Sequence, residues 1–427
     1  MQRVLSLQMT RGIGESSEFV TKRMCCSFLF SVGFLCLLFG FLLGRFATQR
    51  AAEFRIEKKR LELAGNGLET TEYLQHLLLK QLERAPLDAD FLTDWQSFDL
   101  KSDDVRRTNG TLSNLSLIHN VNEYQSCITA IVRGSIEPDR YVVLSASGEG
   151  VGIVLKLAKA LNDIKEQHGW MPRRSLIFCL FAGTSDPCSE LLPSYMLHRI
   201  VAYIVIHHQA SQGRGPFVVA GSDIVQSMVL EVASVVKDKF SYKDQLISVN
   251  NMPRNATTSR LTLNISHAVL SFVNNDAASN DTAIERERRQ IILTQILSQT
   301  VWRLSDCLIM KWNPSYLNET ISKALESVNS TELSQIKEKT RDTSVTLLSK
   351  LNILIGRIDA IDSTNSLDTR ILNDLLMDLD RALLCSDISG ANWAEFFRLN
   401  HESFNVILQY LNRMVMCYEK AIQLLQD

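Results

Sequence analysis

The sequence predicts an α/β domain with a mixed sheet, preceded by one membrane-spanning helix and followed by an all-helical domain. Three observations support this prediction: an uncharged run near the N-terminus, apolar runs that alternate with helical periodicity between residues 125 and 278, and helical periodicity alone after residue 285. The composition is that of a folded protein, with 45% apolar and 22% charged residues. A formal net charge of −2 gives no reason to expect nucleic acid as a partner.

The uncharged run, Met24–Gly44, contains 21 residues, which is enough for one helix to span a bilayer. A secretory signal peptide is the alternative interpretation. However, 23 residues precede the run, its apolar length exceeds that of a typical signal core, and no small-x-small cleavage site follows it. We therefore expect a cytoplasmic tail at residues 1–23 and an uncleaved transmembrane helix at Met24–Gly44.

Two sequence signals disagree on the orientation of this anchor. Three basic residues lie near its start and six follow its end, and this bias alone would place the C-terminal part in the cytosol. Seven N-x-S/T sequons all follow the anchor and favour a lumenal C-terminal part. We expect a single-pass type II membrane glycoprotein of the plasma membrane or secretory pathway. The glycosylation candidates are Asn109, Asn114, Asn255, Asn264, Asn280, Asn318 and Asn329.

Residues 45–124 are expected to form a stalk and a remnant segment, helix-like and charged up to residue 85 and then polar and irregular. Between residues 125 and 278, apolar runs alternate with helical periodicity, which is typical of a partly parallel sheet covered on both faces. Cys179 falls within one such run and is expected to be a buried thiol. The expected strands are 128–133, 141–144, 175–182, 200–206 and 267–273, and the expected helices are 151–164 and 223–238.

Residues after 285 show helical periodicity only. Apolar residues recur at helical spacing in three segments, around residues 292–304, 372–383 and 404–425. Such stripes must be buried, either against one another or against a second subunit. The spacing alone leaves both possibilities open.

The strand-to-helix junction at residues 141–152 is the first candidate site, because ligands in α/β proteins gather at the carboxyl ends of strands. Its sequence, YVVLSASGEGVG, places glycines as G-x-G-x-G rather than as the G-x-G-x-x-G of a dinucleotide loop, and no P-loop lysine follows. Glu149 would repel a phosphate, and the residues around Ser147 do not form the G-x-S-x-G of a nucleophile elbow. A metal site is the third possibility.

A family resemblance bears on that possibility. Residues 128–144, ITAIVRGSIEPDRYVVL, together with 168–178, HGWMPRRSLIF, resemble the start of the protease-like domain in the glutamate carboxypeptidase II and transferrin receptor family. Residues 371–383, ILNDLLMDLDRAL, resemble the family's helical dimerisation domain. The resemblance implies a zinc-exopeptidase-like sheet flanked by helices at residues 125–278 and a dimerisation domain at residues 285–427.

Active members of the family hold two zinc ions with histidine and acidic ligands and use a glutamate as general base. By this resemblance, Ser147 stands at the position of the first histidine ligand, Glu149 takes the place of its acidic partner, and the segment with the bridging aspartate is missing. Thr184 and Ser185 replace the base and the ligand beside it, and His207 replaces a ligand aspartate. The segment of the last histidine ligand is also missing, between residues 275 and 284.

A rescued zinc site would have to use Glu149, Asp186, His207 and His208. Such a set lacks the bridge and the base, and Glu149 and Asp186 are more simply interpreted as solvated loop charges. We therefore expect no metal, no cofactor and no catalysis, but a membrane-anchored peptidase homologue that acts through protein–protein interaction. The alternatives are a zinc-dependent carboxypeptidase or dipeptidase with an atypical ligand set, and a structural or chaperone-like subunit of a membrane complex.

The resemblance also implies a partner. The family dimerises through its C-terminal helices, so we expect a homodimer or a heterodimer with a full-length family member. Only the polar residues 86–124 occupy the place of the family's large apical domain, so transferrin binding is not carried over. The dimerisation candidates are Leu375, Leu379, Phe404, Leu408, Leu411 and Val415.

Overall fold

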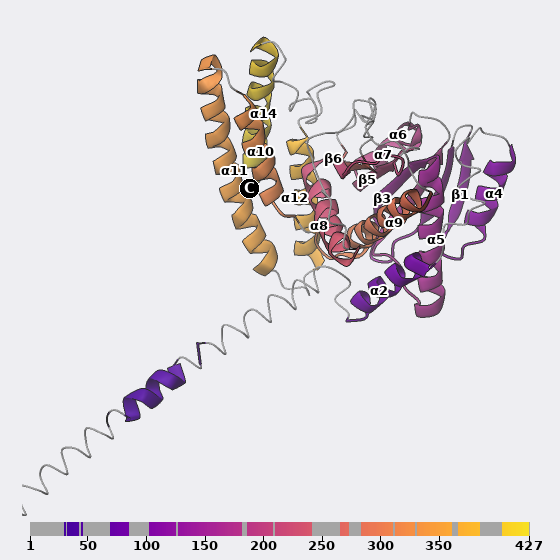
Figure 1. Cartoon of the computed structure of the whole chain (residues 1–427), viewed down its shortest axis with the longest axis horizontal. Coiled ribbons are helices and arrows are strands. Elements are labelled where there is room, and N and C mark those ends of the chain that lie inside the picture. Colours follow the sequence, from indigo (N-terminus) through magenta and orange to yellow (C-terminus); the bar gives the residue numbers. More distant parts are fainter. Residues whose placement is uncertain are drawn as a thin grey trace, which may run out of the picture. The chain divides into compact units, whose positions relative to one another are not determined.

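A computed structural model divides the chain into two compact units, Met1–Arg60 and Leu61–Asp427, and each is described by itself (Figure 1). In the second unit, a mixed sheet is covered by helices and followed by further helices. The structure describes residues 30, 32–41, 44–45, 69–84, 102–124, 127–181, 186–207, 210–240, 265–272, 283–310, 312–328, 331–360, 366–384 and 404–426.

The N-terminal unit contains the expected membrane anchor. Within Met24–Gly44, the described residues are helical, and large apolar side chains such as Phe34, Leu37 and Phe39 are exposed. The other residues of the anchor and the expected tail at residues 1–23 lie outside the described residues. None of the helices in the described parts of the chain is both long and apolar enough to cross a bilayer.

Seven strands form the sheet of the second unit, in the order β1-β2-β4-β3-β5-β7-β6. Strands β4, β3, β5 and β7 run parallel, whereas β1, β2 and β6 pair antiparallel at the two edges. The predicted mixed sheet with flanking helices is confirmed. The strands are β1 (Asn120–Tyr124), β2 (Cys127–Val132), β3 (Glu137–Ser147), β4 (Arg174–Phe181), β5 (Ile200–Ile206), β6 (Phe217–Gly221) and β7 (His267–Phe272).

The central strands are buried on both faces, as their continuous apolar sequences predict. Because successive side chains point to opposite faces, Leu144 and Phe178 belong to a large apolar core, whereas Val143 and Ile177 belong to a smaller one. The smaller core also receives side chains from the short helices that follow β4. These helices are α6 (Cys188–Leu191) and α7 (Ser194–Leu197).

Helix α5 (Glu149–His168) follows β3 after a single residue, Gly148. Gly148 has a φ angle of 53°, and Gly169, with a φ angle of 68°, ends the helix by donating its N–H to a carbonyl of the last turn at 2.8 Å. Both conformations favour glycine. Gly150 approaches β5 so closely that an added Cβ would lie 2.8 Å from Ile206. The turn therefore holds the start of α5 against the ends of β3 and β5.

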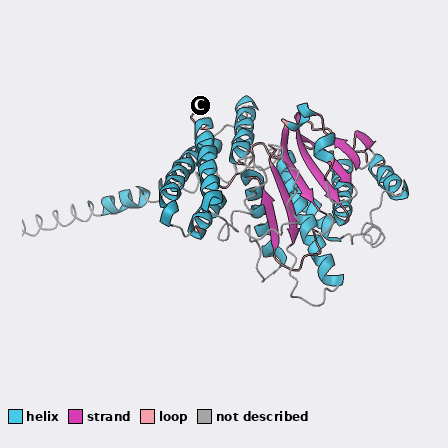
Figure 2. Cartoon of the chain, turned by 90° about the horizontal axis from the view of Figure 1, so that it is seen from above, coloured by secondary structure: helices cyan, strands magenta, loops and turns pink. Residues whose placement is uncertain are grey.

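Three more helices pack with α5 on the large core, and Figure 2 shows helices lying along the strands of the sheet. The apolar residues Leu74, Leu78 and Leu82 of α2 are buried, and α2 packs against α5 and α9. Helix α2 is thus part of the α/β domain and not a separate stalk, because packing against α5 and α9 removes its apolar stripe from water. The three helices are α2 (Glu69–Arg84), α8 (Asp223–Phe240) and α9 (Ala283–Asp306).

Residues 86–124 are not all irregular, contrary to the expectation. They contain helix α4 (Ser102–Ser113), whose Leu112 is buried, and strand β1. The sequence of β1, NVNEY, is polar because β1 is an edge strand with largely exposed side chains, so its apolar content gave no signal. Tertiary pairing with β2 is what makes this segment a strand.

The described residues after β7 are largely helical, as predicted. Helix α14 packs against both α11 and α12, and α12 also packs against α8. Helix α9, expected within the helical domain, instead packs against β3 and β4 of the sheet. The helices are α10 (Ser315–Ser327), the 3-10 helix η3 (Thr331–Leu333), α11 (Ser334–Ala360), α12 (Ser366–Leu383) and α14 (Phe404–Leu424).

Candidate functional site

Two of the predicted site residues, Ser147 and His207, lie at the carboxyl ends of the neighbouring parallel strands β3 and β5. Ser147 ends β3, is buried, and its hydroxyl has no hydrogen-bond partner among the described residues. His207 follows β5, is half-buried, and its carbonyl accepts the N–H of Ala210 at 3.0 Å. Two groups of polar contacts lie near these strand ends, one around Glu149 and one around Asp186.

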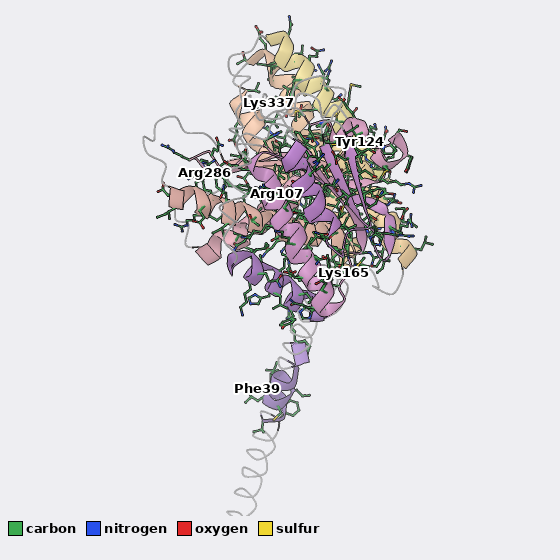
Figure 3. All side chains as sticks on the ribbon, turned by 90° about the vertical axis from the view of Figure 1, so that its right-hand side faces the viewer. Phe39, Arg107, Tyr124, Lys165, Arg286 and Lys337 are labelled. Carbon is green, nitrogen blue, oxygen red and sulfur yellow. A yellow bond between two sulfur atoms is a disulfide. The ribbon has the colours of Figure 1, made fainter. Side chains whose placement is uncertain are left out.

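Glu149 is buried, and its carboxylate has three side-chain partners. Its Oε1 accepts hydrogen bonds from the Gln212 amide at 3.1 Å and from the guanidinium of Arg286, and its Oε2 accepts one from the Ser211 hydroxyl. Arg286, labelled in Figure 3, lies in the first turn of α9. It forms an ion pair with Glu149. The expectation that Glu149 is a solvated loop charge was wrong, because a buried carboxylate requires such partners.

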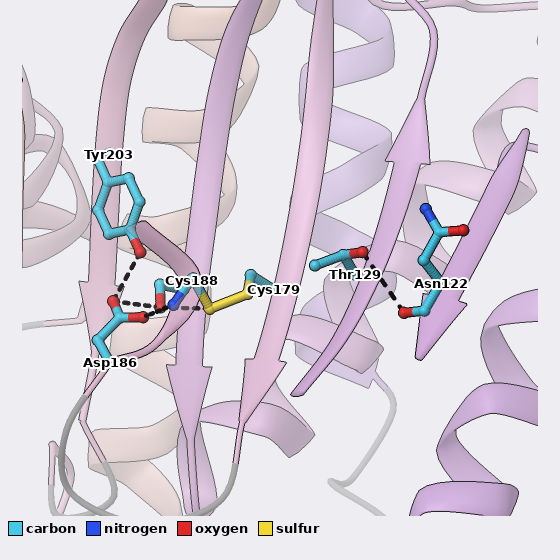
Figure 4. The surroundings of a disulfide bond; sticks show 7 residues. Asn122, Thr129, Cys179, Asp186, Cys188 and Tyr203 are labelled. Atoms are coloured by element: carbon cyan, nitrogen blue, oxygen red, sulfur yellow. Dashed lines mark hydrogen bonds between the residues drawn. A yellow bond between two sulfur atoms is a disulfide. The ribbon is translucent and has the colours of Figure 1, made fainter. Parts of the chain in front are cut away.

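Asp186 is the centre of the second group (Figure 4). Its Oδ2 accepts hydrogen bonds from the Ser145 hydroxyl at 2.6 Å and the Tyr203 hydroxyl at 2.7 Å, and its Oδ1 accepts the N–H of Cys188 at 2.9 Å. Burial, and then the charge of Asp186, raise the pKa of Tyr203 well above its usual value, so the phenol keeps the proton that it donates. Asp186 is therefore also not a solvated loop charge.

A disulfide joins Cys179 in β4 to Cys188 at the start of α6, nine residues further along the chain. The expectation of a thiol at Cys179 was wrong. Strand periodicity shows only that Cys179 is buried, whereas its pairing depends on how α6 folds back over β4. A free, buried cysteine, Cys127, begins the neighbouring strand β2.

The described residues do not fit the two-zinc centre that the resemblance implies. Both oxygens of Glu149 and both oxygens of Asp186 accept hydrogen bonds from protein groups, and the guanidinium beside Glu149 would repel a metal ion. Thr184, Ser185 and His208 lie outside the described residues. Within the described ranges, the single group of three potential ligands close enough to share an ion consists of Cys127, Cys179 and Cys188.

Among the residues of this site that were not predicted are Arg286 and Tyr203. Arg286 stands in the charged run ERERR at the start of α9, but 137 residues separate it from Glu149 and no local pattern pairs them. Tyr203 lies within the apolar run of β5, and its polar hydroxyl was the available signal, since a buried tyrosine needs a hydrogen-bond acceptor.

Three of the seven sequon asparagines lie among the described residues. Asn114 and Asn318 are exposed, and Asn109 is half-buried, with its Nδ2 donating to Glu123 Oε2 at 3.0 Å. Glycosylation of these residues stays a prediction. The sequons outside the described residues are Asn255, Asn264, Asn280 and Asn329.

The dimerisation candidates divide into buried and accessible residues. Leu379, Leu411 and Val415 are buried within the helices of a single chain, because α14 packs against α11 and α12. These three side chains therefore pack internally and present no surface to a partner. Leu375 and Leu408 are half-buried, and Phe404 is 40% exposed.

Known proteins resemble short segments of the chain. It is 37% identical over 67 residues to transferrin receptor protein 1 of Gallus gallus and 29% identical over 107 residues to aminopeptidase NAALADL1 of Mus musculus. The predicted resemblance to the glutamate carboxypeptidase II and transferrin receptor family is confirmed. The matches cover 13% and 20% of this chain but only 9% and 14% of these family members. No protein-family model matches the chain.

Solved structures of aminopeptidases are also similar to parts of the chain. LapA of Legionella pneumophila has 9% sequence identity and a TM-score of 0.39, over 54% of this chain and 76% of LapA. BSAP, a zinc aminopeptidase of Bacillus subtilis, has 11% identity and a TM-score of 0.32, over 42% of this chain and 50% of BSAP.

Proposed function

We propose that this chain is a catalytically inactive, membrane-anchored peptidase homologue that acts through protein–protein interaction. The observation that carries the proposal is the Glu149–Arg286 ion pair at the strand-to-helix junction. There, an arginine and two uncharged donors neutralise and solvate the buried carboxylate. The arginine supplies the positive charge that a metal ion would supply in a zinc enzyme.

The residues at the other family positions support the same proposal. A two-zinc hydrolase needs a bridging ligand and a base that takes a proton from the attacking water. By the resemblance, Ser147 occupies the position of a histidine ligand, and a serine hydroxyl is not among the usual zinc ligands. His207, at another ligand position, could still bind zinc but lacks the partners that a two-zinc centre needs. Both oxygens of the Asp186 carboxylate already accept hydrogen bonds, from two hydroxyls and a backbone N–H, so Asp186 is not free to act as the base.

Metal content and peptide cleavage test the loss of catalysis. The full-length chain, kept oxidised, is incubated with Zn²⁺, freed of unbound ion and assayed with dipeptides and amino-acid amides, with and without a chelator. Mouse NAALADL1, prepared in the same way, is the positive control. We expect no chelator-sensitive cleavage by the wild type or by Glu149→Gln. Two zinc ions per chain together with chelator-sensitive cleavage would establish the atypical zinc peptidase instead.

The proposal includes a type II topology in the secretory pathway. The exposed sequons at Asn114 and Asn318 and the Cys179–Cys188 disulfide support an oxidising, glycosylating compartment for the C-terminal part. We expect enzymatic deglycosylation to lower the apparent mass of the chain expressed in animal cells. Asn114→Gln should lower it before treatment. A mass unaffected by the enzyme would favour the cytosolic orientation.

The proposed interaction includes a homodimer or a heterodimer with a family member. Leu367 and Ile371 are exposed on α12 and lie one helical turn apart, with half-buried Leu375 one turn further on, so they form an apolar stripe. We expect Ile371→Asp to reduce the oligomeric mass of the chain in detergent. Val345→Asp, on α11, is the matched control. An unchanged mass for Ile371→Asp would remove this stripe from the proposal.

A further inference from the structure

Three cysteines meet next to the Asp186 group. Because Thr129 lies opposite Cys179 in the antiparallel pair of β2 and β4, Cys127 faces the same side two positions along. Cys188 completes the group from the start of α6, and Figure 4 shows its disulfide with Cys179. All three residues are buried, and their Sγ atoms lie within 4.8 Å of one another.

The surroundings of this three-cysteine cluster are acidic. Asp186 accepts the N–H of Cys188, and the Ser145 hydroxyl, which donates to Asp186, lies 3.6 Å from the Cys188 Sγ. Burial first, and then the charge of Asp186, raise the pKa of the Cys127 thiol to about 11. A bare thiolate is therefore disfavoured here, whereas a cation bound to the sulfurs would be attracted by the nearby carboxylate.

We propose that the three-cysteine cluster binds one zinc-type divalent cation when the Cys179–Cys188 disulfide is reduced. Thiolates are preferred zinc ligands at about 2.3 Å, which places two tetrahedral sulfur ligands about 3.8 Å apart. The Cys127 sulfur already lies within 4.8 Å of the other two, and reduction frees the bonded pair to move apart to that spacing. The site uses none of the residues at the family's zinc positions, so it is independent of the proposed loss of catalysis.

Opening the site requires a reductant. A dithiol supplies two electrons and two protons: it becomes a disulfide itself, and Cys179 and Cys188 become thiols. The cation then displaces the thiol protons, so that three protons are released as three metal–sulfur bonds form. In the oxidised chain, Cys127 is the one cysteine of the cluster that keeps a thiol, and the ion has no adequate ligand set.

Thiol–disulfide exchange is the competing use of the same atoms. The Cys127 sulfur would attack Cys179 or Cys188, form a new disulfide and release the other sulfur, which would take up the proton of Cys127. Exchange would move the disulfide onto Cys127, whereas the structure places it between Cys179 and Cys188 and leaves Cys127 free. We therefore expect peptide mapping of the oxidised chain to find Cys179 bonded to Cys188. A disulfide that contains Cys127 would overturn the proposal in favour of exchange.

Cobalt binding tests the metal site, because Co²⁺ takes the ligands of Zn²⁺ and its thiolate complexes absorb light. The full-length chain is reduced with a phosphine under anaerobic conditions and is then titrated with Co²⁺. We expect the reduced wild type to bind one Co²⁺ more per chain than Cys127→Ser, with a thiolate-to-cobalt absorption band. The band should disappear on addition of Zn²⁺ and be absent from the oxidised chain.

Matched variants separate this site from the two other free cysteines that the structure describes. Cys307→Ser removes a second free, buried cysteine and should keep the full band, and Cys36→Ser, which removes an exposed one, should keep it too. Circular dichroism shows whether Cys127→Ser folds. If the buried serine hydroxyl impairs folding, Cys127→Ala takes its place. An absent band in the reduced wild type, or an equal band in a folded Cys127 variant, would overturn the proposal.

Discussion

Glu149 and Asp223 stand at equivalent places in two strand-to-helix connections, yet the fold treats their charges differently. Each is the first residue of a helix that follows a strand, α5 after β3 and α8 after β6. Glu149 is ion-paired with Arg286. Asp223 instead accepts the indole N–H of Trp312 at 2.9 Å, and burial, followed by the charge of Asp380, raises its pKa to about 8.

The comparison shows two ways to accommodate a carboxylate with limited access to water, buried for Glu149 and half-buried for Asp223. Pairing with an arginine keeps the charge and makes stability depend on the partner. A raised pKa removes the charge by protonation and makes stability depend on pH. The Glu149–Arg286 pair links α5 to α9 beside the candidate site. Asp223 lies where α8 meets α12, since Asp380 of α12 accepts the N–H of Ile224 at 2.8 Å.

The largest expected effect comes from removal of the arginine. Arg286→Met leaves the buried Glu149 carboxylate without its cation, and we expect the free energy of unfolding to fall by about 3 kcal/mol. Chemical denaturation of the full-length chain measures this loss. The double variant Glu149→Gln, Arg286→Met, which removes both charges, should recover much of it. Equal losses in the single and double variants would mean that the unpaired Glu149 carboxylate is not the cause of the loss.

The sequence predicts the elements of the fold better than the partners of its charges. The apolar runs of β4 and β5 and the periodic residues of α5 specify their elements locally, so the predicted and observed ranges nearly coincide. The polar edge strand β1 and the packing of α2 depend on neighbours that no local pattern reveals.

The candidate site shows the same limit. Glycine spacing and Glu149 argued against a phosphate loop, and the burial of Cys179 followed from its strand. The partners Arg286 and Cys188 could not be read from the sequence, because they arrive from helices whose positions are set by tertiary packing. Glu149 was therefore expected to be a solvated loop charge, whereas the fold buries it and pairs it with Arg286.

The second expected effect is a pH dependence carried by Asp223. Its folded pKa of about 8 lies above its unfolded value near 3.8, so unfolding releases a proton between these values. The stabilisation is fully present below about pH 4 and is lost as pH rises towards 8. We expect Asp223→Asn to flatten the decline of the unfolding free energy by about 2 kcal/mol between about pH 5 and pH 7.

Denaturation curves across this pH range check the prediction as a difference between the two proteins. Two neighbours titrate in both proteins, since burial raises the pKa of Asp380 and lowers that of His267. Because the charge of Asp380 also raises the pKa of Asp223, the difference between the two profiles reports Asp223 together with its coupling to Asp380. Parallel pH profiles for the wild type and Asp223→Asn would show that Asp223 is ionised in the fold, like a paired carboxylate.

The smallest expected effect concerns the indole that donates to Asp223. Trp312→Phe removes one hydrogen bond, so we expect a loss of about 1 kcal/mol in the free energy of unfolding. Because this bond lowers the pKa of Asp223, its removal should raise that pKa and extend the pH-dependent decline to higher pH. In the Asp223→Asn background, Trp312→Phe should lower stability without moving the pH profile. A shift of the pH profile in that background would mean that Trp312 acts on the titration of Asp380. The pH dependence assigned here to Asp223 would then be a property of the coupled Asp223–Asp380 pair.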